Sequence, residues 1–302
     1  MIDWKSNDLD VYLWDVGHGL SMTFITPFVS FAGDVPINRR RVIQIDVGTN
    51  NEYSFSPVKF LVEKTGLSTI DYLIISHPDQ DHINDLVNIN ELCTAGKLQV
   101  TRFRRNHTIP NNVISEDANK ESTAKTVYKN MQNTYIYQHL PHDDVNPDNF
   151  AGLTIKTDYI EYEDGMDIND ASVVTNILFG NTQLLIPGDL SEVGFNKLAL
   201  AGKAPAVIDR ATRILVAPHH GRESAEGIYL VNHLKPHIVL ASAKVGDEHT
   251  DRLYSQSQNI QGHNVVNDSG TITQYRFLAT KGQVISLKIV NDSPIIKKIS
   301  YK

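Results

Sequence analysis

Four short apolar segments of this chain each run directly into aspartate or histidine side chains. The segments are 41–45, 71–75, 184–186 and 214–216, and they are followed by Asp46, His77, Asp189 and His219. Their length and their content of Val, Ile and Leu predict buried β-strands. A strand is a rigid element that presents the loop after it, and four such arrivals of Asp or His are hard to obtain by chance. The pattern therefore predicts a site built from strand ends.

The densest of these motifs is His77-Pro78-Asp79-Gln80-Asp81-His82, with four potential metal ligands in six residues. Positions 77, 79 and 81 can point to one side of an extended loop, while His82 opens the next helix. Imidazole and carboxylate together suit first-row divalent metals such as zinc or manganese. The alternative is a polar helix start, in which Asp79 or Asp81 caps the helix and the histidines are solvated.

The other three motifs have alternatives of the same kind. Gly188-Asp189 predicts a carboxylate that bridges two metals, but Asp189 or Ser191 could instead cap the helix that follows. Ala217-Pro218-His219-His220-Gly221 offers two adjacent imidazoles directly after a strand, and Asp46-Val47-Gly48 offers a carboxylate.

Composition limits the class of protein. The 302 residues carry 35 acidic and 28 basic side chains, which leaves a net charge of −7, and the single cysteine, Cys93, excludes a disulfide framework and a cysteine-built zinc cage. No apolar run reaches the roughly 18 residues of a membrane span, and the first residues lack the apolar stretch of a secretory signal. We therefore expect a cytoplasmic enzyme with no membrane association.

The charge balance bears on nucleic acid as a partner. A chain at −7 has no global attraction for phosphates, although its arginines are grouped at 39–41 and 102–105. A cluster of aspartates around bound metals would hide part of the negative charge.

The element order predicts two packed sheets with helices outside. Strands are expected at 11–14, 22–25, 41–45, 71–75, 98–104, 153–155, 173–179, 183–186, 214–216, 238–240, 271–277 and 284–290, helices at 57–64, 82–92, 120–132 and 192–200, and a long loop at 137–150. Ser56 is expected to cap the first helix and Gly66 to follow it. Neither repeats nor a dividing linker are evident, so residues 1–302 are expected to form one domain.

Together these motifs, in this order, resemble the metallo-β-lactamase fold, and within it the ComEC-like branch of DNA-uptake proteins and their stand-alone relatives. The resemblance covers about residues 10–277 and also rests on a Val-Gly-x-Gly turn, on Asp in place of the second histidine of the metal motif, on an Asn-x-x-Ser pattern, on a serine-ended strand and on a later histidine, here 16–19, Asp79, 169–172, Ser242 and His249. It implies an α/β protein, a four-layer αββα sandwich. Arg222 stands where this branch usually has a small residue.

The resemblance implies a dinuclear site that holds two divalent ions, Zn²⁺ or Mn²⁺. One ion would take His77 and Asp79, the other Asp81 and His82, with Asp189 bridging. His219 or His220 would complete the second ion, and the other would face the substrate. The remaining predicted roles are His139 or His142 as a third histidine for the first ion, Asp46 as support for a ligand, His249 as a proton donor and Arg222 as a clamp on a phosphate oxygen.

The function expected from this site is hydrolysis of phosphodiester bonds by a metal-bound hydroxide. A nuclease acting on DNA comes first, from the resemblance and the grouped arginines. A phosphodiesterase for a small molecule, such as a cyclic nucleotide or a phosphorylcholine ester, is the alternative that the net charge favours. A lactonase-type hydrolase fits less well, since those branches generally keep histidine at the position of Asp79. A non-catalytic binding module fits least, since competent ligands occupy every core position.

Overall fold

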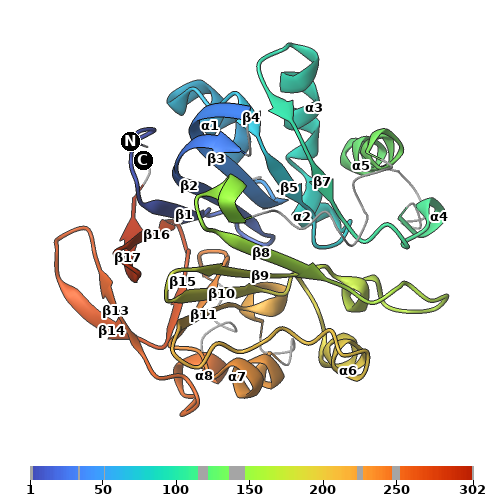
Figure 1. Cartoon of the computed structure of the whole chain (residues 1–302). Helices are drawn as coiled ribbons and strands as arrows, with labels where there is room; N and C mark the ends of the chain where they lie inside the picture. The colour runs from blue at the N-terminus through green and yellow to red at the C-terminus, as the bar shows by residue number, and fades with distance from the viewer. Residues whose placement is uncertain are drawn as a thin grey trace.

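The structure is a computed structural model that describes residues 3–32, 35–50, 52–114, 122–135, 147–222, 227–246 and 252–300. Two large β-sheets dominate these residues, and helices cover the outer face of each sheet (Figure 1). The ends of the chain lie close together, because β1 (Leu9–Leu13) pairs with β16 (Val284–Val290) in the same sheet.

The first sheet has nine strands in the order β14-β13-β17-β16-β1-β2-β3-β5-β7. Its other strands are β2 (Ser21–Ala32), β3 (Val35–Val47), β5 (Tyr72–Ile74), β7 (Phe103–Arg104), β13 (His263–Val266), β14 (Ile272–Tyr275) and β17 (Ser293–Ile299). Strands β3, β5 and β7 are parallel neighbours, so the loops that follow them leave at one edge of the sheet.

The second sheet has six strands in the order β15-β12-β11-β10-β9-β8. They are β8 (Thr154–Asp158), β9 (Val174–Phe179), β10 (Thr182–Ile186), β11 (Thr212–Val216), β12 (Ile238–Ala241) and β15 (Phe277–Ala279). Strands β10, β11, β12 and β15 pair in parallel, which again brings their following loops to one edge. A separate pair joins β4 (Thr69–Ile70) to β6 (Gln99–Val100).

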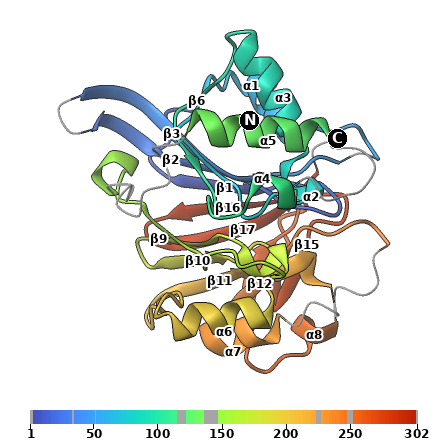
Figure 2. The same cartoon turned by 90° about the vertical axis from the view of Figure 1, so that its right-hand side faces the viewer.

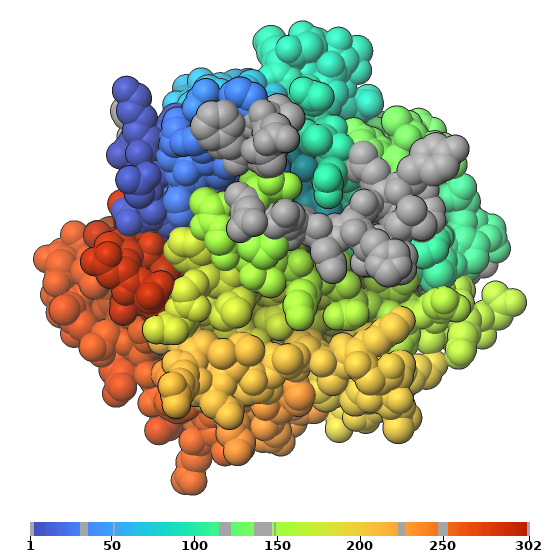
Figure 3. All heavy atoms as spheres, viewed as in Figure 1, coloured from blue at the N-terminus to red at the C-terminus, as the bar shows by residue number. Residues whose placement is uncertain are grey.

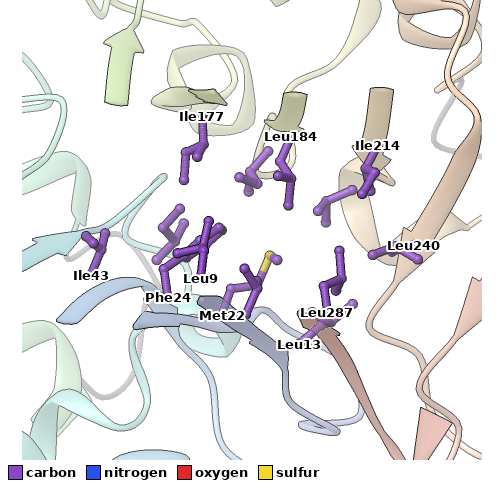
Figure 4. Close-up of a cluster of buried hydrophobic side chains, with 14 of the residues drawn as sticks. Leu9, Leu13, Met22, Phe24, Ile43, Ile177, Leu184, Ile214, Leu240 and Leu287 are labelled. Atoms are coloured by element: carbon purple, nitrogen blue, oxygen red, sulfur yellow. The ribbon is translucent and has the colours of Figure 1, made fainter. Parts of the chain in front are cut away.

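The apolar face of each sheet packs on the other, and their side chains meet between them (Figure 4). Leu9, Met22 and Phe24 come from the first sheet, whereas Ile177 and Leu184 come from the second. Removal of this apolar surface from water is the main force that holds the two sheets together.

A second and a third apolar layer lie between each sheet and its helices (Figure 2). The first sheet is covered by α1 (Pro57–Thr65), α2 (Gln80–Ile83), α3 (Leu86–Thr94), α4 (Asn111–Ile114) and α5 (Thr123–Thr134). The second is covered by α6 (Glu192–Leu200), α7 (Ile228–Leu234) and α8 (Arg252–Ser255), while η1 (Pro147–Phe150), η2 (Ile168–Ala171) and η3 (Pro218–Gly221) are single 3₁₀ turns. The predicted four-layer αββα sandwich is confirmed.

The space-filling view shows how the chain divides between the two sides of the sandwich (Figure 3). Residues before about 110, in blue to cyan, form the upper side together with α5, and β9 to β12 with α6 and α7, in yellow to orange, form the lower side. No helix among the described residues is long and apolar enough to cross a membrane.

Local signals in the sequence account for the helix that begins most clearly. Ser56 caps α1 by accepting a hydrogen bond from the backbone N–H of Lys59, Pro57 takes the first helical position, and Gly66 ends the helix in the left-handed conformation. This helix was predicted with the same cap and the same terminator.

Two predicted elements are divided in the structure. The helix expected at 82–92 is broken into α2 and α3, because Asp85 turns away from the helix: its N–H donates to the carbonyl of Val47, and its carboxylate accepts from Ser56 and Val58. The strand expected at 98–104 splits into β6 and β7, which pair with different partners. Strands β13 and β17 and helix α7 were not predicted.

Candidate metal centre

The ends of four strands bring the predicted residues together at one edge of the sandwich. Asp46 lies at the end of β3, His77 follows β5, Asp189 follows β10, and His219 and His220 follow β11. The two sheets meet here, since His82 Nε2 from the first half of the chain lies 3.2 Å from Asp189 Oδ1 in the second half.

Asp46 and Ser76 fix the orientation of two histidines. The fully buried Asp46 carboxylate accepts hydrogen bonds from the backbone N–H of Ser76 at 2.6 Å, from Ser76 Oγ at 2.7 Å and from His82 Nδ1 at 2.8 Å. Because the Ser76 hydroxyl donates to Asp46, its oxygen accepts from His77 Nδ1 at 3.0 Å. Both rings therefore keep their proton on Nδ1 and turn Nε2 toward the site.

The two Nε2 atoms are buried without a hydrogen-bond partner among the described residues. The contact from His77 Nε2 to Asp79 Oδ2 is 3.6 Å, which is too long for a hydrogen bond. Buried polar nitrogens normally have a partner, and a pair without one needs an explanation. An imidazole whose Nδ1–H is held by a carboxylate or hydroxyl is the usual form of a metal ligand, so these residues fit a metal ion.

Asp189 and His220 complete the group from the second sheet. His220 Nε2 lies 3.1 Å from Asp81 Oδ2 and 3.4 Å from Asp189 Oδ2. Two sets of donors result, His77 with His82 and Asp189, and Asp81 with His82 and His220, and within each set the ligand atoms lie within 4.8 Å of one another. Nitrogen and carboxylate donors at this spacing suit zinc or manganese.

His219 and His220 occupy a strained turn. Both have positive φ values, 50° and 61°, which are uncommon for residues other than glycine. This turn places the two rings differently: His220 is buried beside Asp81, whereas the His219 side chain is 37% exposed and its Nε2 lies 4.0 Å from Asp189. His220 is therefore the member of the pair that lies among the donors.

The site is electrostatically coupled. Burial alone lowers the pKa of His82, but the carboxylates of Asp189 and Asp46 raise it well above its ordinary value. Burial raises the pKa of Asp189, but His220 and His82 outweigh this and hold it well below its usual range. A cluster of buried groups whose charges depend on one another is typical of a functional site.

The helix-cap alternatives considered from the sequence do not account for the aspartates. Asp79 stands at the N-cap of α2 but makes no capping hydrogen bond. Ser191 caps α6 by accepting from the backbone of Val193 and Gly194, so Asp189 has no part in that cap. Both carboxylates are available to the site.

The remaining predicted residues lie differently. Arg222 is half-buried, and after burial and the neighbouring Asp189 and His220 its charge contributes to lowering the pKa of His219. His139, His142 and His249 lie outside the described residues.

Sequence reasoning gave no role to three residues that position the metal loop. Ser76 links Asp46 to His77, and its place directly before the histidine was the available signal. Gly19 and Gly48 press on the loop from below: a Cβ at either position would lie 2.2 or 2.5 Å from the carbonyl oxygen of Asp81. Glycine is required where the backbone approaches this closely.

The arginines expected to contact nucleic acid are structural. Arg40 is 1% exposed and pairs with Asp10 at 2.8 Å, and Arg39 pairs with Asp71 at 2.7 Å. Arg104 and Arg105 are buried, the first donating to Thr157 and the second to Gln132. The alternative that these arginines are solvated is also wrong for Arg40, Arg104 and Arg105.

Comparisons with known proteins give one sequence relative. No protein-family profile matches the chain. ComE operon protein 3 of Bacillus subtilis (strain 168) is 24% identical over 291 residues, which are 90% of this chain and 33% of that protein. The chain thus spans about one third of the length of this relative.

Solved structures similar to the chain include three of relevant description. They are the metallo-beta-lactamase fold protein YhfI from Bacillus subtilis (13% identity, 70% of this chain and 71% of that one, TM-score 0.34), a diphosphatase from the PhnP family (12%, 77% and 87%, 0.39) and CmlA, a diiron beta-hydroxylase from Streptomyces venezuelae (14%, 78% and 45%, 0.38). These scores are low, and the fold is established by the two packed sheets and their covering helices.

Proposed function

We propose that this protein is a metal-dependent hydrolase of phosphodiester bonds, with His77, Asp79, Asp81, His82, Asp189 and His220 as the residues that hold the metals. The observation that carries the proposal is the pair of buried Nε2 atoms, on His77 and His82, that face Asp189 without a hydrogen-bond partner among the described residues. A site with an oriented donor and no protein partner is built for an ion.

Two divalent ions in such a site, about 3.5–4 Å apart, lower the pKa of a shared water and offset the charge of a phosphoryl group. The protein's own contribution is to fix the donors. Asp46 and Ser76 hold the two imidazoles, and the packing of Gly19 and Gly48 against the Asp81 carbonyl holds the metal loop. Asp189 lies between the two histidines that come from different sheets, within 3.2 Å of His82 and 3.4 Å of His220.

In the reaction water adds to phosphorus, and the bond from phosphorus to the leaving oxygen breaks. The water loses a proton and the leaving oxygen gains one, so the products are a phosphomonoester and an alcohol. We assign this second proton to Nε2 of His219, which is more exposed than His220 and lies 4.0 Å from Asp189. Arg222, beside His219, is placed to meet a phosphate oxygen.

DNA and small phosphodiesters share this reacting group, so both are candidate substrates. The resemblance to the ComEC-like branch supports DNA. The burial of Arg40, Arg104 and Arg105 removes the support that the sequence had seemed to give it.

The test joins metal analysis to turnover. We expect the purified full-length chain to retain about two zinc or manganese ions, and to cleave bis(p-nitrophenyl) phosphate or plasmid DNA when either metal is supplied in excess. Protein that retains no metal, and that no added metal activates, would contradict the proposal.

A further inference from the structure

A cavity of about 490 Å³ opens beside the metal loop. One wall is the loop itself, with Asp79 and Asp81, and the opposite walls come from α5, with Lys125, and from the segment 160–168. Figures 1 and 2 both show α2, α4 and α5 close together at this edge. The volume lies in the range of small-molecule pockets.

The cavity communicates directly with the candidate metal centre. Asp81, which lines it, contacts His220 at 3.1 Å, and Asp79, which also lines it, lies 3.6 Å from His77. A group seated in this cavity would therefore lie next to a phosphorus atom held at the metals.

The walls of the cavity differ in chemistry. Tyr162, Met166 and Ile168 are half-buried and present a mainly apolar surface, and Lys125 is the cation among the described residues that line the cavity. The apolar wall is anchored, since the backbone N–H of Tyr162 donates to Thr108 at 2.8 Å. Such a wall accepts an aromatic or aliphatic group, and the ammonium accepts a phosphate oxygen.

The rim of the cavity is acidic. Residues 157–170 contain six carboxylates and no lysine or arginine, and four of these, Glu161, Glu163, Asp164 and Asp167, are exposed. A nucleic-acid chain that entered across this rim would bring its phosphates against these carboxylates, whereas a protein that binds such a chain needs basic side chains along its path.

We propose that the cavity is the substrate pocket of the centre and that it takes a small phosphodiester with one anionic phosphate and an apolar, aromatic-sized substituent. Lys125 holds a phosphate oxygen, and Tyr162, Met166 and Ile168 hold the substituent. The proposal rests on the proposed function for the nature of the reacting group.

Binding of two non-hydrolysable anions tests the pocket without turnover. Phenylphosphonate and methylphosphonate carry the same anionic group and differ in the ring. Calorimetric titration of the metal-loaded full chain should give a Kd for phenylphosphonate at least about 10-fold lower than for methylphosphonate, because the ring leaves water for the apolar wall.

Three variants separate the parts of the pocket. Lys125→Met should raise both Kd values about 10-fold, since a charge-assisted contact is lost. Met166→Gln should bring the two Kd values together, within about 3-fold, because the amide disfavours the ring. Lys129→Met, one turn along the same helix and outside the cavity lining, is the matched control and should change neither value. Metal content, measured for every variant, should stay at the level of the parent chain.

Equal affinity for the two phosphonates, or unchanged binding in Lys125→Met, would overturn the pocket assignment even if phosphodiesters are hydrolysed. Discrimination by the ring in a chain that hydrolyses no phosphodiester would uphold the pocket and refute the proposed reaction. A 20-nucleotide DNA strand that displaces phenylphosphonate with an affinity falling steeply with salt would overturn the small-substrate assignment.

Discussion

Two sets of buried charged or polar side chains occupy opposite situations in this protein. Every side-chain nitrogen of Arg40 has an acceptor: Nε donates to Thr26, one terminal nitrogen to Asp3 with Asp10 beside it, and the other to Asp8 and Ile25. At the strand ends, by contrast, Nε2 of His77 and of His82 has no hydrogen-bond partner among the residues that the structure describes.

The contrast separates a structural role from a functional one. A buried polar group that is fully satisfied by its own chain stabilises the fold, while an oriented group left unsatisfied is completed by something from outside. The sequence ranks the two sets alike, because both are runs of charged residues beside apolar strands. The hydrogen bonds distinguish them.

The largest expected effect concerns the carboxylate between the histidines. Asp189→Asn should lower kcat/KM on bis(p-nitrophenyl) phosphate by at least about 1,000-fold, because the metals supply several kcal/mol of charge stabilisation. Retained metal and the thermal unfolding midpoint are measured on the same sample. Near-normal turnover in a folded Asp189→Asn protein would refute the two-metal site.

Arg40→Met should destabilise the fold by about 3–5 kcal/mol, because it leaves Asp10 and several carbonyl oxygens without their buried partner. Chemical denaturation measures the free energy of unfolding. The metal content of the fraction that remains folded should equal that of the parent chain. A loss of metal from folded protein would mean that Arg40 also supports the site.

Alanine at both Arg104 and Arg105 should destabilise the fold by about 2–3 kcal/mol, since each guanidinium makes buried hydrogen bonds. The change in kcat/KM should be the same for DNA and for bis(p-nitrophenyl) phosphate. Selective loss of DNA cleavage would show that these arginines contact nucleic acid in spite of their burial.

The smallest effect is expected from the carboxylate behind His82. Asp46→Asn should weaken metal affinity by about 10- to 100-fold, because the acceptor that orients the imidazole loses its charge. Competition with a chelator measures this affinity. Asp71→Asn is the matched control, a buried carboxylate near a strand that pairs with Arg39, and it should leave metal affinity unchanged. Equal weakening in both variants would show a general effect on the fold.

Much of the layered architecture could be predicted from periodicity. Apolar strands in two batches with helices between them bury their faces in few ways, and the αββα sandwich is one of them. The boundaries failed where a side chain made a distant bond, as Asp85 does with Ser56 in splitting the helix expected at 82–92. Such a contact has no signature within the segment itself.

By itself the sequence determined which residue types stand at which strand ends, and hence that Asp46, His77, Asp81, His82 and Asp189 belong to one group of candidate ligands. Tertiary structure alone decided the rest. It turned His220 inward and His219 outward through two positive φ angles, it buried the arginines, and it opened a cavity beside Asp79 and Asp81. These outcomes depend on which groups meet across the two sheets, and contacts between residues far apart in the chain leave no local pattern to read.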